Sequence, residues 1–269
     1  MKKTKQYFII GMVCAIFIGV AILNFFVGVK PHNAHYIKLE VNPKIEFITD
    51  RNNIVTSIMP LNEEAYELLI QENFTGLSIE EATEKFIDLC TKANYIDVNS
   101  KSNAVRLTIV SGFMQALELK VYETINTYFI ENEILACIIE NDNDRAEIKK
   151  AKENKVSSAN KLSIIESILS KNSSFEFEEL NKKTERDLLE ILKETHKLSG
   201  YSSSNFTSTQ LANKSKLIDS NRTRLEEHRK NITSNSQREF HKKYDEHKRL
   251  NLSKYEPNFE SKYNSWKTA

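Results

Sequence analysis

The chain has 269 residues with 38 basic and 37 acidic side chains, so it allows one or two domains and carries almost no net charge. This balance excludes a uniformly basic nucleic-acid binder. Three cysteines without a Cys-x-x-Cys pair exclude a disulfide scaffold and a cysteine-based zinc module. The charge is spread unevenly. Residues 1–30 hold four basic and no acidic side chains, residues 31–196 hold 19 against 29, and residues 197–269 hold 15 against 8.

An uncharged run of 23 residues, Tyr7–Val29, dominates the N-terminal region. A helix of that length spans about 35 Å, more than the ~30 Å hydrocarbon core of a bilayer, and we expect a transmembrane helix at residues 7–29. A cleaved signal peptide is the alternative, but its apolar part usually has only ~7–15 residues. The lysines before the run place the N-terminus in the cytoplasm. The expected protein is a single-pass protein of the cell membrane, with a cytoplasmic stub at residues 1–6 and the remainder outside.

Short strand and helix patterns follow one another through residues 36–140, which is typical of a small α+β domain. We expect strands at residues 36–41, 44–48, 54–59, 104–110 and 134–139, and helices at residues 62–71, 78–93 and 114–129. Ser78 and Glu81 form a capping box that marks the start of the second helix. Cys90 and Cys137 fall on apolar faces, where small core residues are the expected role.

Residues 156–196 predict a short helical extension, because apolar side chains recur there at helical spacing and Thr184 begins a capping pattern. Short helices cannot bury their apolar faces alone, so these must pack on the preceding domain or on each other. Residues 197–269 are rich in Asn, Ser, Lys and Arg, and we expect a largely disordered basic tail. The excess positive charge of this tail would allow it to bind an anionic cell-wall polymer or lipid headgroups. The alternative is a tail that is solvated and binds nothing.

Three segments resemble, in order and spacing, the extracytoplasmic domain of the RsgI family of bacterial transmembrane anti-sigma-I factors. They are Lys38-Leu-Glu-Val-Asn-Pro-Lys-Ile-Glu-Phe47, Arg51-Asn-Asn-Ile-Val55 and Leu61-Asn-Glu-Glu64. Gly76-Leu-Ser-Ile-Glu-Glu-Ala82 is similar to the next helix start of that domain. The resemblance covers residues 36–111 well and residues 112–192 more loosely.

The resemblance implies a membrane signalling protein that regulates transcription. Members of the family hold a sigma factor away from RNA polymerase with a cytoplasmic domain. Their outer domain cuts itself at an Asn-Pro bond, and an intramembrane protease then cuts the anchored stub and frees the sigma factor. Here the corresponding bond joins Asn42 to Pro43, and these two are the expected site residues. Self-cleavage is the only catalysis that the resemblance implies.

The chemistry of an Asn-Pro bond allows one route to cleavage. Proline has no N–H, so its nitrogen cannot attack the asparagine side chain. The side-chain nitrogen of Asn42 can instead attack its own carbonyl, which gives a succinimide and releases Pro43 as a new N-terminus. Strain or polarising groups must assist this weak nucleophile. Glu40 and Glu46 are near in sequence, without an assignable role, and a plain Asn-Pro turn is the alternative.

The sequence departs from the family pattern before the apolar run, where about six residues stand in place of the several dozen of a sigma-binding domain. A start-site error is one explanation, and an outer module that lacks the sigma-binding domain is another. This leaves a second hypothesis, a membrane-anchored scaffold that binds envelope components or a partner protein outside the cell. No motif predicts a cofactor or a nucleic-acid partner. His32 and His35 lack a third ligand at convincing spacing, so the sequence predicts no metal site.

Overall fold

The computed structural model describes residues 34–111 and 114–268. This part of the chain is mixed α+β, as the sequence predicts. The expected transmembrane helix at residues 7–29 and the expected stub at residues 1–6 lie outside the described residues. Within those residues, no helix combines the length and the apolar character that crossing a bilayer requires.

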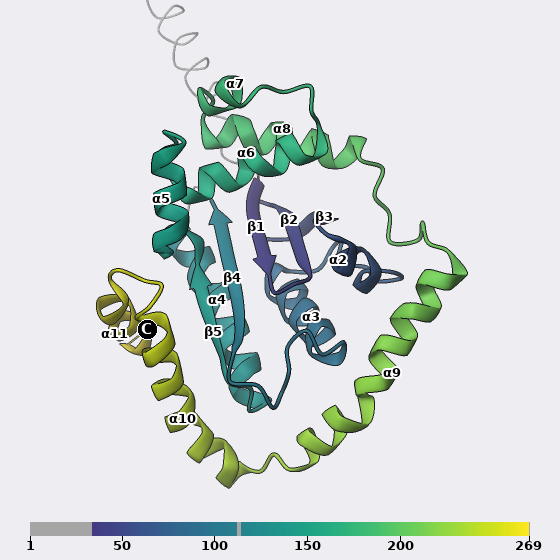
Figure 1. The fold of residues 1–269 in the computed structure, drawn as a ribbon, viewed down its shortest axis with the longest axis vertical. Helices are drawn as coiled ribbons and strands as arrows, with labels where there is room; N and C mark the ends of the chain where they lie inside the picture. Colours follow the sequence, from purple (N-terminus) through teal and green to yellow (C-terminus); the bar gives the residue numbers. More distant parts are fainter. Residues whose placement is uncertain (1–33, 112–113, 269) are drawn as a thin grey trace, which may run out of the picture. The chain divides into compact units, whose positions relative to one another are not determined.

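A five-stranded sheet with the order β3-β2-β1-β4-β5 forms the centre of the fold (Figure 1). Its strands are β1 (Ala34–Glu40), β2 (Lys44–Asp50), β3 (Val55–Pro60), β4 (Asn103–Val110) and β5 (Ala136–Glu140). β1 pairs antiparallel with β2 and with β4, β2 pairs antiparallel with β3, and β4 pairs parallel with β5. The first described strand, β1, therefore lies in the middle of the sheet, and residues 41–43 connect it to β2.

One face of the sheet packs against the long helices α3 (Ile79–Lys92) and α4 (Met114–Glu131), while α2 (Glu63–Leu68) follows β3. α3 begins where the sequence predicts, because the Ser78 hydroxyl and the Glu81 carboxylate satisfy each other's backbone N–H groups. The core on this side joins strand residues to helix residues: Ile37, Leu39, Phe47, Phe86, Cys90, Val121 and Ile125. Cys90 is fully buried and Cys137 is also buried, both as free thiols, which confirms their expected core role.

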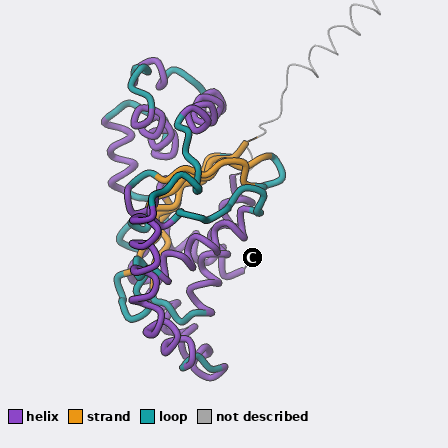
Figure 2. The backbone as a smooth tube through the Cα atoms, turned by 90° about the vertical axis from the view of Figure 1, so that its right-hand side faces the viewer, coloured by secondary structure: helices purple, strands orange, loops and turns teal. Residues whose placement is uncertain are grey.

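Four helices lie on the side of the opposite face. They are α5 (Arg145–Glu153), α6 (Ala159–Lys171), α7 (Phe177–Asn181) and α8 (Glu185–Leu198), and they follow a 3-10 turn, η1 (Asn141–Asn143). α6 and α8 contact the strands, and α5 and α7 pack against α6. The apolar side chains of these helices pack on Tyr36 and Ile48 of the sheet. Figure 2 shows the strands between helices on both sides. Since both faces are covered, the polar residues His35, Glu46 and Thr49 of β1 and β2 are buried as well as the apolar ones.

The expectation of a largely disordered tail is wrong, because residues 208–268 form three helices. These are α9 (Ser208–Lys230), α10 (Ser234–Leu252) and α11 (Phe259–Thr268). α9 contacts α2 and α3, and α10 contacts α4 and β5, so the segment follows the outside of the sheet domain (Figure 1). Thr207 and Thr233 cap the first two helices through capping boxes.

A narrow stripe of large side chains explains why this polar segment folds. Phe240, Tyr244, Lys248 and Leu252 recur every four residues along α10, and all four are buried. Lys248 takes an apolar position because its Nζ lies over aromatic rings, 5.0 Å from the ring centre of Tyr122 and 5.8 Å from that of Tyr244. A stripe one residue wide leaves the average composition polar, so composition alone predicts disorder.

Candidate functional site

The Asn42-Pro43 bond lies at the tip of the β1–β2 hairpin. Glu40 pairs with Lys44, and the backbone N–H of Val41 donates to the carbonyl oxygen of Pro43 over 2.9 Å. Asn42 is therefore the single residue at the apex of the turn. The reciprocal hydrogen bond from residue 43 to residue 41 cannot form, because proline has no N–H.

Asn42 holds an unusual backbone conformation, with φ at 128°. The other described non-glycine residues with positive φ lie between 48° and 63°, which is the ordinary left-handed region that asparagine tolerates. A φ of 128° lies outside that region and favours glycine, so Asn42 stores strain of about 1–3 kcal/mol. The strained residue is the one whose carbonyl carbon would be attacked in self-cleavage.

The surroundings of the turn are asymmetric. Asn42 is exposed, while Pro43 is buried against the domain. On the far side of Pro43, the backbone N–H of Lys44 donates to the side-chain oxygen of Asn62 over 3.0 Å, and Asn62 also caps α2. The second half of the turn is thereby held in place, while Asn42 itself is exposed.

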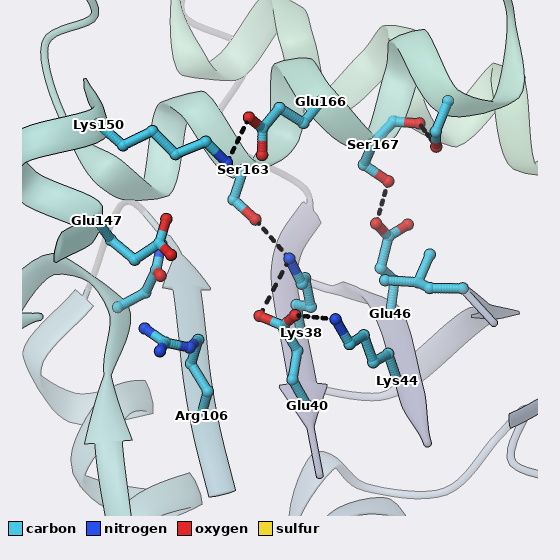
Figure 3. A pocket seen from close by; sticks show the side chains of 13 residues that line it. Lys38, Glu40, Lys44, Glu46, Arg106, Glu147, Lys150, Ser163, Glu166 and Ser167 are labelled. Carbon is cyan, nitrogen blue, oxygen red and sulfur yellow. Dashed lines mark hydrogen bonds and ion pairs between the residues drawn. The ribbon is translucent and has the colours of Figure 1, made fainter. Parts of the chain in front are cut away.

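Charged side chains flank the turn on the face covered by α5 and α6. The Glu40 carboxylate lies 3.1 Å from the Lys38 ammonium and 3.5 Å from the Lys44 ammonium. These three residues line a polar pocket of about 450 Å³, in which Lys150 and Glu166 form a further ion pair at 2.8 Å (Figure 3). Glu40 is thus the carboxylate beside the candidate cleavage bond, and it is neutralised from two sides.

Glu46 lines the same pocket, but its carboxylate is fully buried in a polar cluster between β2 and the helices above it. Its carboxylate accepts hydrogen bonds from Ser167, from Tyr36 at 3.2 Å, from Lys171 at 3.1 Å and from His196 at 2.9 Å. Burial alone would raise the pKa of Glu46. The His196 hydrogen bond and the Lys171 charge outweigh that effect and lower the pKa to about 2. Glu46 is fully engaged in joining β2 to α6 and α8, and it is not placed to assist at Asn42.

The sequence of the described fold matches one known family. Residues 34–167, about half of the chain, match the anti-sigma factor RsgI-like central domain. These residues are an RsgI-like central domain.

Relatives from Acetivibrio thermocellus agree with this assignment. The anti-sigma-I factor RsgI7 is 26% identical over 107 residues, which is 39% of this chain and 19% of that protein. The anti-sigma-I factor RsgI4 is 25% identical over 132 residues, or 45% of this chain and 24% of that protein. The chain therefore matches about a quarter or less of the length of these relatives.

Within the RsgI-like central domain, both site residues predicted from the sequence lie together at the β1–β2 turn. Both nearby carboxylates line the polar pocket, with Glu40 beside the turn and Glu46 in the buried cluster. Lys171 and His196, which complete that cluster, lie beyond the matched residues. Sequence reasoning missed the cluster because the alternation in β1 and β2 is also the pattern of a strand with one solvent-exposed face.

Residues 34–111 and 114–268 contain no group of three His, Cys, Asp or Glu side chains that could hold a metal ion. His35 is buried in β1 of the RsgI-like domain, and its Nδ1 lies 2.7 Å from the Ser111 hydroxyl. His32 lies outside the described residues.

Proposed function

We propose that this chain is a membrane-anchored signalling protein whose RsgI-like central domain cuts its own backbone at Asn42-Pro43. The observation that carries the proposal is the φ of 128° at Asn42, at the apex of a one-residue turn before the only Asn-Pro bond in the sequence. Cleavage converts Asn42 to a planar succinimide and so releases the strain held at that residue.

The reaction needs no outside reagent. The side-chain nitrogen of Asn42 forms a bond to its own carbonyl carbon, the bond to the Pro43 nitrogen breaks, and that nitrogen takes up the proton lost by the amide. The two fragments together keep the mass of the chain until water opens the succinimide. The reaction occurs once per molecule, so the protein is not a turnover enzyme in this step.

The fold would keep the two fragments together after the cut. β1 on the N-terminal side pairs with β2 and with β4, both of which lie on the C-terminal side. Ile37 and Leu39 are fully buried in the shared core. A signal that separates β1 from the sheet would then be relayed through the proposed transmembrane helix at residues 7–29, with an intramembrane protease and, indirectly, a sigma factor as proposed partners.

The test is a denaturing gel with intact-mass spectrometry on the purified full chain in detergent. The wild type should give two fragments that begin at residues 1 and 43, and an Asn42→Ala variant should remain intact. An Asn53→Ala variant is the matched control, because Asn53 also has positive φ, at 63°, but does not precede proline. In native buffer, the two wild-type fragments should elute as one species.

An uncut wild-type chain would contradict self-cleavage and favour the second candidate, a membrane-anchored scaffold. A break that persists in Asn42→Ala would also contradict it, since contaminating proteases would then be the cause. Sedimentation of the full chain with membranes, resistant to alkaline washing, tests the anchor separately. Release into the soluble fraction would contradict the anchor.

A further inference from the structure

Three side chains from three elements form a hydrogen-bonded line through the buried cluster. The Ser57 hydroxyl of β3 lies 3.0 Å from Nδ1 of His196 on α8, and Nε2 of His196 lies 2.9 Å from the Glu46 carboxylate of β2. The side chains of His196 and Glu46 are almost completely buried. Ser57 is half-buried at the outer end of the line.

The partners of Glu46 fix where the protons lie. Tyr36 and Lys171 both donate to its carboxylate, so the group is an acceptor and Nε2 of His196 must carry a proton toward it. In neutral imidazole this leaves the lone pair on Nδ1, which faces the Ser57 hydroxyl. A hydroxyl whose proton points at an imidazole lone pair is the arrangement of an activated serine nucleophile.

The outer end of this line opens into a pocket of about 620 Å³, which Ser57 and His196 both line. The pocket lies between β3, the segment 72–75 and the end of α8. Phe74 and Tyr201 give it apolar walls, and Asn73 and Lys193 give it hydrogen-bond donors. Glu72 and Lys197 also line it, and the Lys197 ammonium is paired with Glu194 over 2.7 Å. The pocket thus combines a nucleophile, a base, an apolar surface and hydrogen-bond donors.

We propose that Ser57, His196 and Glu46 form a Ser–His–Glu site that hydrolyses small carboxylic esters. Ser57 Oγ bonds to the ester carbonyl carbon while its proton moves to Nδ1 of His196. The tetrahedral intermediate then expels the alcohol, which takes that proton. Water cleaves the acyl-serine in the same way, releasing the acid and restoring Ser57. Ser57 and His196 are the catalytic residues, and Glu46 is a positioning residue that holds the imidazole in the required tautomer.

The nitrogens of His196 are reversed relative to the familiar serine hydrolase triad, in which Nε2 faces the serine and Nδ1 faces the carboxylate. Either imidazole nitrogen can accept a proton, so the chemistry is the same. The site is independent of the proposed self-cleavage, because neither Asn42 nor Pro43 lines the pocket. An Asn42→Ala variant should therefore keep the esterase activity, and the two proposals can fail separately.

The first measurement is labelling of the full-length protein with a fluorophosphonate, followed by peptide mapping. One adduct should form, at Ser57. Ser174 is the matched comparison within the same chain, since it is exposed and its hydroxyl donates to Asn172 instead of meeting a histidine. An unlabelled Ser57 in cooperatively folded wild-type protein overturns the proposal, and so does equal labelling of Ser57 and Ser174.

The second measurement is hydrolysis of p-nitrophenyl acetate. Ser57→Ala and His196→Gln should each lower kcat at least about 100-fold, whereas Ser174→Ala should leave it unchanged. Glu46→Gln should lower kcat without changing KM, because Glu46 does not contact the substrate. If His196→Gln or Glu46→Gln does not fold, the kcat of Ser57→Ala and the fluorophosphonate labelling of the wild type still test the proposal. Wild-type hydrolysis that survives Ser57→Ala overturns the proposal.

Discussion

At the scale of single residues, Asn42 shows how a turn can carry chemistry. An asparagine in the ordinary left-handed region costs little, and Asn53, Asn94 and others adopt it here. Asn42 is different because its φ of 128° suits glycine, and because the proline after it removes the hydrogen bond that would complete the turn. The family resemblance predicts a cleavage bond at this position, while the strain is visible only in the structure.

Replacing Asn42 by glycine should therefore stabilise the uncut fold. We expect Asn42→Gly to raise the free energy of unfolding by about 1 kcal/mol relative to Asn42→Ala, because glycine adopts this φ without a steric penalty. Urea unfolding of both variants, neither of which can cleave by the asparagine route, measures the difference. Asn53→Gly against Asn53→Ala is the control at φ 63°, where the gain should be smaller. Equal gains at both positions would contradict unusual strain at Asn42.

At the scale of elements, local signals predicted most of the sheet domain. The strands at residues 44–50 and 103–110 and the helix beginning at Ser78 lie within two residues of their expected bounds. A turn, an alternation or a capping box is complete within a few residues, so a sequence shows it directly. The order of the strands depends on contacts between distant residues, and the sequence did not predict it.

The sequence did not predict the C-terminal helices, for a related reason. The stripe on α10 is one residue wide, and one of its four members is a lysine. Only the neighbouring aromatic rings make that lysine a packing residue. The local signals at Thr207 and Thr233 were present, but helix caps alone do not show that a helix has a surface to pack on.

The packing of α10 predicts opposite results for two substitutions on the same helix. Phe240 is 7% exposed, whereas Leu250 is 53% exposed. Phe240→Ala should lower the free energy of unfolding by about 3 kcal/mol, and Leu250→Ala should change it by no more than about 0.5 kcal/mol. Urea unfolding of the full chain gives both values. A negligible effect at Phe240 would mean that α10 does not pack on the sheet domain in solution.

At the scale of the whole molecule, the cluster around Glu46 joins two layers. Its carboxylate belongs to the sheet, while Lys171 and His196 belong to the helices on one face. A buried carboxylate with several donors is costly to leave unpaired, so both layers must be in place together. The sequence shows each of these residues, but it cannot bring positions 46, 171 and 196 together before the fold is known.

This cluster predicts how stability depends on acid. The pKa of Glu46 is about 2 in the folded protein, below its ordinary value of 4.5. A lowered folded pKa contributes stability that is present above pH 4.5 and is lost as the pH falls toward 2. The contribution of Glu46 is about 3 kcal/mol at neutral pH. The difference in unfolding free energy between wild type and Glu46→Gln, measured by urea unfolding at several pH values, should shrink over this range.

The control for this measurement is Glu166→Gln, which removes a carboxylate of the same pocket that is 44% exposed and paired with Lys150. The difference between wild type and that variant should stay small at every pH, since exposed ion pairs contribute little. A constant difference between wild type and Glu46→Gln down to pH 2 would show that Glu46 is not charged in the folded state.

The central place of β1 also determines how the domain would respond to mechanical force. A break at Asn42-Pro43 would leave β1 attached only to the residues before Ala34. Tension from that side pulls on a strand that is hydrogen-bonded along both edges, so the ladders to β2 and to β4 resist it together. A domain cut at this turn would therefore withstand small thermal fluctuations and yield abruptly when the pulling force exceeds what both ladders can bear together.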